Sequence, residues 1–432
     1  MTGALPPVVC SSPPLFLLIL TMNATRLLTV AVAAVAATGL RAQFAEGFDS
    51  QATADITEVT QPDTTVTYVD YSNMTVGATT WSIPEAPRRI PGTAPTRGVL
   101  IQCNTDSTPA ATAANLIAGA TPLVFSGRYR LSFDAWINVP IPIPGGGTEQ
   151  LLWGVGVDNI TPIEARNNRG AGTAGIYGWI CGENGYGTED AAINDGDFEL
   201  ADLGDLQPGE SVPFNEAFDS GIPGTANSCA GNRWVRVDID TDATGTRVYF
   251  NGVEFFNEPN GIAPAGHAMI GYEDPFSSIS GSPDGQWGLL DNFRVTTPTG
   301  CGTTGTAIAQ GTATAGEILN GSAPPAISAP LTMRLRGGPT SSAVFMTTGQ
   351  PSPVTLPVPI DGNCTINVEI VTLDGFIPVS TNADGGGIFT IEVPNNAAFC
   401  GFQQGWQWLW LDFANPLCPF QLTEGMVTTF GS

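Results

Sequence analysis

The sequence predicts an all-β protein, with an N-terminal jelly-roll β-sandwich followed by a smaller C-terminal β-sandwich. Apolar and polar residues alternate with a period of two along many short segments, whereas no segment shows the periodicity of an amphipathic helix. The chain contains 52 Gly and 35 Pro, and these residues separate the segments together with Asn and Asp. Many short strands joined by such turns are typical of sandwiches and jelly rolls.

Residues 1–42 are expected to be a secretory signal peptide rather than part of the fold. Met22, which we take as the true start, is followed by Arg26, an apolar run over residues 27–40 and the small-residue end Arg41-Ala42. A charged, an apolar and a small-residue region in this order are the parts of a signal peptide. The run is too short for a membrane span. We therefore expect an exported protein that is extracellular or lies at the cell surface.

The first domain is expected over residues 43–297. Its clearest alternation lies in residues 128–135 and 234–240. Asn251-Gly252 separates two apolar stretches, and Asn-Gly in this position indicates a β-hairpin turn. Further strands are expected near residues 151–157, 175–180, 267–272 and 287–295.

Residues 298–316 are rich in Thr, Gly and Ala and are expected to form a linker to a second β-domain over residues 317–432. In this second domain, Trp406, Trp408 and Trp410 share one face of a predicted strand. The opposite face is apolar as well, which favours a central strand with tryptophan in the core over a platform that stacks on sugars.

Composition excludes several functions. The chain has 40 acidic residues, 15 Lys and Arg together and a net charge of −25, and it contains no lysine. Such a surface repels nucleic acid and anionic lipid, although clustered carboxylates attract divalent cations. The lack of lysine excludes a Schiff base and a phosphate-binding loop of the GxxxxGK type. His267 is the only histidine, which excludes zinc sites with two histidines in one chain, and we expect it to be structural.

Seven cysteines remain after signal cleavage, and in an exported protein they are expected to form disulfides. Our prediction leaves Cys103 unpaired, although the sequence does not determine the connectivity. The predicted pairs are Cys181–Cys229, Cys301–Cys364 and Cys400–Cys418.

Short motifs give two resemblances that together cover nearly all of the mature chain. The first domain resembles concanavalin A-like (lectin- or glucanase-type) jelly rolls of secreted bacterial proteins. The motifs are residues 44–49, 234–237, 248–252 and 290–295. The second domain resembles a C-terminal module of many secreted bacterial proteins, which has no known enzymatic role. Its motifs are residues 300–302, 356–359, 394–396 and 402–413.

Two carboxylates are predicted to lie on apolar stripes. Glu46 shares a strand face with Phe44 and Phe48, and Asp291 shares one with several apolar residues of the closing strand. An isolated charge there is costly. The resemblance implies that the first and last strands are neighbours, so Glu46 and Asp291 are expected to meet.

A structural calcium ion would account for such a pair of acids, since Ca²⁺ accepts several oxygen ligands. Asp49 and Asn292 are the expected additional ligands of this site. The alternatives are an arginine partner, or a β-bulge that turns Asp291 to solvent.

The preferred function is non-catalytic binding of a polysaccharide or another surface ligand. The expected stacking residues are Trp136, Trp153, Tyr177 and Trp179. Glycosidases need two carboxylates flanking the scissile bond, and the Glu-x-Asp-x-x-Glu strand motif of laminarinase-like jelly rolls is absent. The alternatives are a divergent glycoside hydrolase or lyase, and a structural cell-surface protein without a small ligand.

Overall fold

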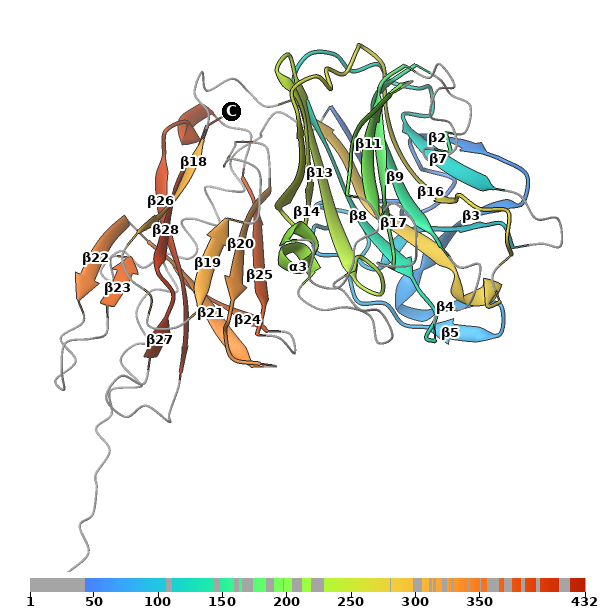
Figure 1. The fold of residues 1–432 in the computed structure, drawn as a ribbon. Helices are drawn as coiled ribbons and strands as arrows, with labels where there is room; N and C mark the ends of the chain where they lie inside the picture. The colour runs from blue at the N-terminus through green and yellow to red at the C-terminus, as the bar shows by residue number, and fades with distance from the viewer. Residues whose placement is uncertain are drawn as a thin grey trace, which may run out of the picture. The chain divides into compact units, whose positions relative to one another are not determined.

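A computed structural model describes most of the chain from residue 43 onward (Figure 1). The described residues are 43–105, 111–142, 148–158, 163–164, 174–183, 190–196, 198–203, 212–218, 229–279, 281–297, 305–310, 313, 316–320, 325, 327, 330–340, 342–349, 351–355, 365–368, 375–381, 385–393, 397–411 and 420–431. The predicted signal peptide lies outside them. No helix of this described part is long and apolar enough to cross a membrane.

Two antiparallel sheets form the first β-body, which runs from β1 to β17. The first sheet has the strand order β15(Val253–Glu258), β14(Gly245–Phe250), β13(Trp234–Asp242), β8(Tyr129–Asn138), β17(Trp287–Thr296), β6(Arg97–Cys103) and β3(Thr64–Asp70), and β1(Phe44–Glu46) also pairs with β17. The second sheet has the order β12(Phe198–Asp202), β11(Ala191–Asp195), β10(Ile176–Cys181), β9(Gln150–Val157), β16(His267–Asp274), β7(Thr112–Ala118) and β2(Ile56–Thr60).

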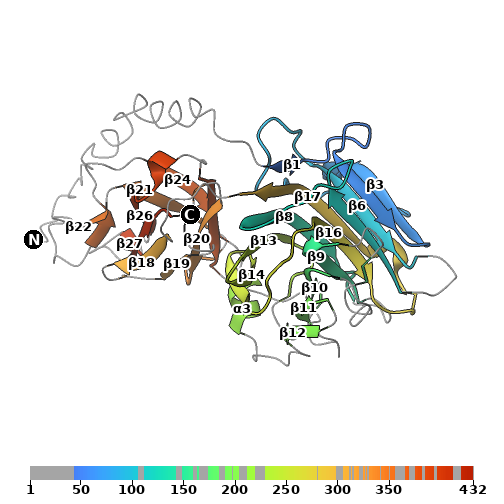
Figure 2. The same ribbon diagram turned by 90° about the horizontal axis from the view of Figure 1, so that it is seen from above.

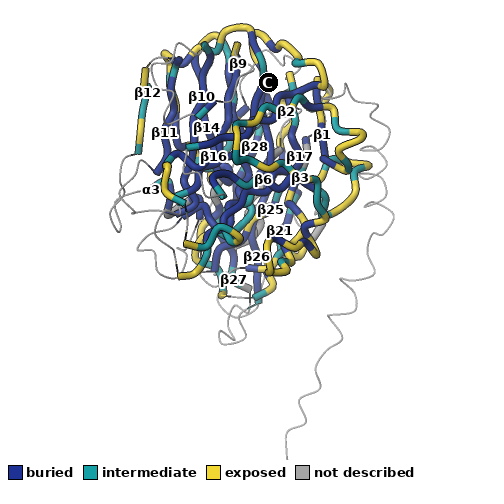
Figure 3. The backbone as a smooth tube through the Cα atoms, turned by 90° about the vertical axis from the view of Figure 1, so that its right-hand side faces the viewer, coloured by how far each residue is buried: buried dark blue, intermediate teal, exposed yellow. Residues whose placement is uncertain are grey.

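The main core lies between the inner faces of these two sheets (Figure 2). Alternate residues of each strand point inward, so that Phe133 of β8 and Trp153 of β9 belong to one apolar cluster. Figure 3 shows buried central strands, with exposure at connecting segments and at the edge strand β12. The predicted all-β fold of two sandwiches, the first of them a jelly roll, is therefore confirmed.

Local turn chemistry also agrees with the prediction. Asn251 and Gly252 join β14 to β15 with φ angles of 49° and 79°, which are the left-handed values that Asn and Gly tolerate best. The sequence did not predict the short helix α3(Val212–Phe218), whose Phe214 and Phe218 pack on Phe255 of β15.

The second β-body has its own core. Its sheets have the orders β18(Thr306–Gln310), β28(Gly425–Thr429), β26(Gln403–Leu411), β21(Ala343–Gly349) and β24(Gly375–Ser380), with β27(Phe420–Leu422) on β26; β19(Glu317–Asn320), β20(Pro330–Arg336) and β25(Gly387–Glu392); and β22(Pro351–Thr355) with β23(Thr365–Val368). Trp406, Trp408 and Trp410 of β26 are buried in this core, as predicted. Strand β18 lies within the segment that was expected to be a linker.

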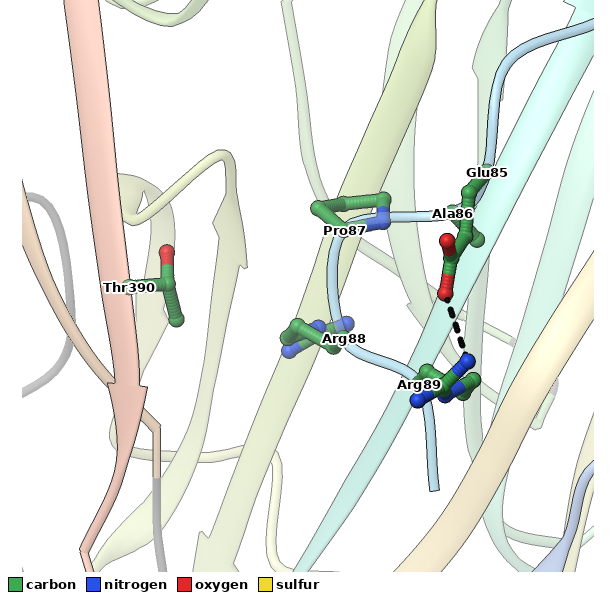
Figure 4. A pocket seen from close by; sticks show the side chains of 6 residues that line it. All are labelled: Glu85, Ala86, Pro87, Arg88, Arg89 and Thr390. Carbon is green, nitrogen blue, oxygen red and sulfur yellow. Dashed lines mark ion pairs between the residues drawn. The ribbon is translucent and has the colours of Figure 1, made fainter. Parts of the chain in front are cut away.

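The outer face of the first sheet is covered by a hairpin of β4(Met74–Val76) and β5(Thr79–Trp81) and by the segment that follows it. Figure 4 shows the residues from Glu85 to Arg89 in this segment. The buried Arg88 forms ion pairs of 2.8 Å with Asp134 of β8 and 2.7 Å with Asp238 of β13. Its guanidinium also donates to the carbonyl oxygen of Phe133. One arginine therefore compensates two carboxylates buried on neighbouring strands.

Replacing Arg88 with methionine is expected to lower the free energy of unfolding by about 3–5 kcal/mol, because two buried carboxylates lose their cation. Arg89→Met is the matched control, since Arg89 and its partner Glu85 are each 47% exposed. An exposed pair of this kind contributes less than about 1 kcal/mol. Urea denaturation followed by tryptophan fluorescence measures both variants. Similar denaturation midpoints for the two variants would contradict the role given to Arg88.

Candidate functional site

Glu46 and Asp49 lie on or next to the first strand, which pairs with the last strand as expected. In this pairing Glu46 is opposite Phe293, and the rings of Phe44 and Phe293 are 4.9 Å apart. The Glu46 carboxylate accepts hydrogen bonds from the backbone N–H groups of Phe48 (2.7 Å) and Asp55 (2.6 Å). The Asp49 carboxylate accepts one from the N–H of Ala94 (2.8 Å). Backbone donors thus satisfy both carboxylates.

Asp291 lies opposite Asp134 of β8 and has a different set of partners. It accepts hydrogen bonds from the hydroxyl of Tyr71 (2.9 Å) and the N–H of Asn292 (2.6 Å). The Asn292 amide donates to Asp134 (2.9 Å) and accepts from the N–H of Ile90 (2.9 Å). A β-bulge does occur at Asn292, but it leaves Asp291 only 4% exposed.

The structure gives the four residues of the predicted calcium site different hydrogen-bond partners. Glu46, Asp49, Asp291 and Asn292 each accept hydrogen bonds from different donors. In the part of the chain that the structure describes, no three His, Cys, Asp or Glu side chains form a metal-binding group. Burial, followed by the nearby charge of Asp134, raises the pKa of Asp291 to about 8. Protonation thus neutralises this carboxyl near neutral pH.

The four predicted stacking residues lie in three different environments. Trp153, predicted as a ligand contact, is fully buried between the sheets. Tyr177 and Trp179 point to the outer face of the second sheet, where both are fully buried. Only Trp136, on the outer face of the first sheet, is partly exposed. The two-residue period predicted that side chains alternate between the two faces of each sheet. It did not predict which outer face would be covered by other segments of the chain.

Trp136 belongs to a group that the sequence analysis missed, which we call the tryptophan patch: Trp81, Trp136 and Trp234. All three are partly exposed. Trp136 and Trp234 are directly opposite each other on β8 and β13, with ring centroids 6.0 Å apart in an edge-to-face arrangement. Trp81 of the covering hairpin packs edge-to-face on Trp287 at 5.4 Å. The indole N–H of Trp234 donates to the carbonyl oxygen of Pro84 (2.7 Å).

The outer face of the second sheet carries a row of polar side chains. Gln150 of β9 lies opposite Glu273 of β16, and both are fully buried. In the amide orientation that suits its neighbours, Gln150 donates to Glu273 (2.8 Å) and accepts from the indole N–H of Trp179 (3.2 Å). Asp190 adjoins β10 through a hydrogen bond from the N–H of Cys181. Its register position is thus three strand spacings from Glu273, or about 14 Å. This exceeds the separation of a glycosidase pair, about 5–9.5 Å.

Three acids are buried together at one end of the first β-body, and we call them the acidic end: Glu149, Glu183 and Asp274. They are 2%, 1% and 2% exposed. Burial, with repulsion from neighbouring acids, raises the pKa of Glu183 to about 8 and that of Glu149 well above its usual range. Burial raises the pKa of Asp274 to about 7. Neither composition nor periodicity pointed to this group, because its members come from the ends of three strands.

The structure describes His267 and four of the seven cysteines that follow the predicted signal peptide. Cys103 is a free, buried cysteine, as predicted. The predicted disulfide between Cys181 and Cys229 is not formed, although both are fully buried; burial alone does not bring two sulfurs into bonding geometry. Cys400 is disulfide-bonded, whereas Cys301, Cys364 and Cys418 lie outside the described residues. His267 begins β16, with its Nδ1 atom 2.9 Å from the carbonyl oxygen of Leu123.

Asp291→Asn is expected to reduce the loss of stability that occurs as pH rises. The folded-state pKa of Asp291, about 8, is above the usual value of a carboxyl group. The protonated form therefore stabilises the fold, and this stabilisation is fully present at acidic pH and is lost progressively as the pH rises to about 8. The stability lost is on the order of a few kcal/mol. Asparagine does not ionise. Urea midpoints at pH 5 and pH 8.5 measure the effect, and parallel pH dependence in both proteins would contradict it.

No protein-family model and no curated protein matches the sequence. Among solved structures, the chain is similar to the Emp47p carbohydrate recognition domain, with a TM-score of 0.32 and 7% identity over 60% of this chain and 98% of that one. The VIP36 exoplasmic/lumenal domain in its Ca²⁺/Man3GlcNAc-bound form has a TM-score of 0.28 and 10% identity over 56% and 89%. Alginate lyase AlgAT5 of polysaccharide lyase family 7 has 0.26 and 12% over 46% and 76%. These proteins include both binding domains and an enzyme, and we draw no functional conclusion from them.

Proposed function

We propose that the first β-body is the carbohydrate-binding part of an exported, non-catalytic protein and that the tryptophan patch contacts the sugar. The observation that carries this proposal is the partial exposure of three tryptophans, two of them opposite each other on β8 and β13 and the third on the hairpin that covers the same sheet. The other three tryptophans of this body, Trp153, Trp179 and Trp287, are fully buried. Contact with a ligand is one reason for leaving the tryptophan patch partly exposed.

The patch has the chemistry that sugar rings require. Indole rings present an apolar face that stacks on the C–H groups of a sugar and an N–H that donates to a hydroxyl. The N–H groups of Trp81 and Trp136 are themselves buried, so a ligand would contact the exposed remainder of these side chains. Packing on neighbouring rings holds each indole in place, so that little side-chain entropy is lost on binding.

The net charge of the chain favours one class of polysaccharide as the ligand. The chain carries a formal net charge of −25, which repels polyuronates and sulfated glycans at low ionic strength. Neutral polysaccharides avoid this repulsion. Glu273 and Asp190, on the outer face of the second sheet, are further apart than the two carboxylates of a glycosidase. Export, inferred from residues 1–42, would place the domain where such polymers occur.

Trp81→Ala is expected to weaken binding to a neutral polysaccharide about 3- to 10-fold, because one stacked aromatic ring contributes about 0.5–1.5 kcal/mol beyond its buried area. The measurement is affinity electrophoresis of the mature chain in gels that contain soluble β-glucan, xyloglucan, galactomannan or, for comparison, alginate. Trp136→Phe tests the second ring with less disturbance to the sheet.

Phe198→Ala is the matched control, because Phe198 is a 73% exposed aromatic residue of the same body on the edge strand β12. It should leave retardation unchanged. The proposal fails if no neutral polymer retards the wild type, or if Trp81→Ala and Phe198→Ala behave alike. Release of reducing ends or unsaturated products during the same incubations would show that the protein is an enzyme, and the proposal of a non-catalytic binding protein would be rejected.

A further inference from the structure

The acidic end contains more buried polar atoms than the described residues satisfy. One carboxylate oxygen of Glu149, one of Glu183 and both amide atoms of Gln286 are buried without a hydrogen-bond partner among the described residues. The hydroxyl of Tyr272 interacts with Glu149, and that of Thr112 interacts with Cys103. Native proteins leave few buried polar atoms unpartnered, and ordered water or an ion commonly occupies the space between them. Four such atoms at one end of the β-body therefore indicate a bound species.

Strand register brings these residues together. Gln150 pairs with both Cys181 and Glu273, so the next position outward aligns Glu149 with Asp274, which is itself opposite Thr112. The N–H of Gly182 donates to the carbonyl oxygen of Glu149 (3.1 Å), which places Glu183 beside this row.

Gln286 directly precedes β17 and therefore belongs to the first sheet's side of the sandwich. A Cβ atom on Gly288 would lie 2.5 Å from the Tyr272 ring, so Gly288 faces the second sheet. Gln286 has an extended backbone two residues earlier and therefore points to the same side. The end of the sandwich thus combines acids of one sheet with an amide of the other.

The chemistry of these atoms selects the kind of ion. Burial raises the pKa of Glu149 most, and the acids Asp274, Glu183 and Glu273 raise it further, against the hydrogen bond with Tyr272. Buried acids that repel one another favour a cation, and the available donors are oxygen atoms of carboxylate, amide and hydroxyl groups. Ca²⁺ takes six to eight oxygen ligands in flexible geometry, whereas Zn²⁺ prefers nitrogen and sulfur.

We propose that Glu149 and Glu183, with the Gln286 amide oxygen and the Thr112 hydroxyl, bind one Ca²⁺ ion between the two sheets. Asp274 is a neighbouring charge rather than a ligand, because it is held by the amide of Asn104 (2.8 Å) and the N–H of Phe276 (2.9 Å). With only two carboxylate ligands, the dissociation constant should be about 10⁻⁴–10⁻³ M, as in extracellular calcium modules. The ion would clamp the two sheets at this end and stabilise the first β-body.

Calorimetric titration of the mature chain with CaCl₂ should give one site, and thermal unfolding should shift upward in millimolar Ca²⁺ relative to EDTA. The double variant Glu149→Gln/Glu183→Gln keeps the side-chain volumes and should weaken Ca²⁺ binding by about tenfold or more. Gln286→Leu removes one neutral ligand and should weaken binding less. If the double variant fails to fold, Gln286→Leu alone decides the proposal.

Asp291→Asn is the matched control, because Asp291 is an equally buried acid on the outer face of the first sheet. It should leave the calcium-dependent shift intact. The proposal is overturned if the wild type shows neither heat of binding nor a thermal shift. It is also overturned if the shift survives in Gln286→Leu and the double variant, or is lost in Asp291→Asn. Sugar binding is measured separately, and a calcium site without sugar binding would leave this inference standing.

Discussion

Buried carboxyl groups dominate the polar energetics of the first β-body, because a charge in a low-dielectric interior is unfavourable unless it is paired, hydrogen-bonded or neutralised. The chain has no lysine, and its acidic residues outnumber its arginines. Buried carboxyl groups of this body are stabilised in three different ways. Arg88 pairs with Asp134 and Asp238, backbone N–H groups hold Glu46, and Asp291 is neutralised by its raised pKa. At the acidic end burial likewise raises the pKa values of Glu149, Glu183 and Asp274, and the unpartnered oxygens of Glu149 and Glu183 are the atoms that we propose bind a cation.

The same covering segment connects this electrostatic arrangement to the proposed binding surface. The carbonyl oxygen of Pro84 accepts the N–H of Trp234, and four residues later Arg88 reaches the buried acids of β8 and β13. The outer face of the first sheet therefore has an aromatic end and a charged centre, both fixed by one stretch of chain. Because the same segment contacts both, the ion pairs of Arg88 help to hold the carbonyl oxygen that positions Trp234. A rigid aromatic surface of this kind loses little entropy when it binds a ligand.

The sequence by itself determined the fold class, because a period of two in apolar residues, with turn residues at the breaks, permits little else. It also predicted the Asn251-Gly252 hairpin and the tryptophan core of β26, which depend on local conformation or on a pattern within one segment. The contact between the first and last strands was expected from the resemblance to concanavalin A-like jelly rolls and not from a local pattern. The unpaired Cys103 was predicted as well, although the pairing of the other cysteines was not derivable.

Only the tertiary structure decided which polar groups meet. The sequence placed Glu46 and Asp291 on apolar strand faces, but the partners of Asp291 are the hydroxyl of Tyr71, which is distant in sequence, and the N–H of Asn292, at a bulge that interrupts the two-residue period of its strand. Trp136 was recognised, whereas Trp234, opposite it on β13, and Trp81, on the covering hairpin, were not, since they come from segments distant in sequence. Periodicity assigns a side chain to one of two faces. Whether that face is core, covered or open depends on long-range packing, which no local pattern contains.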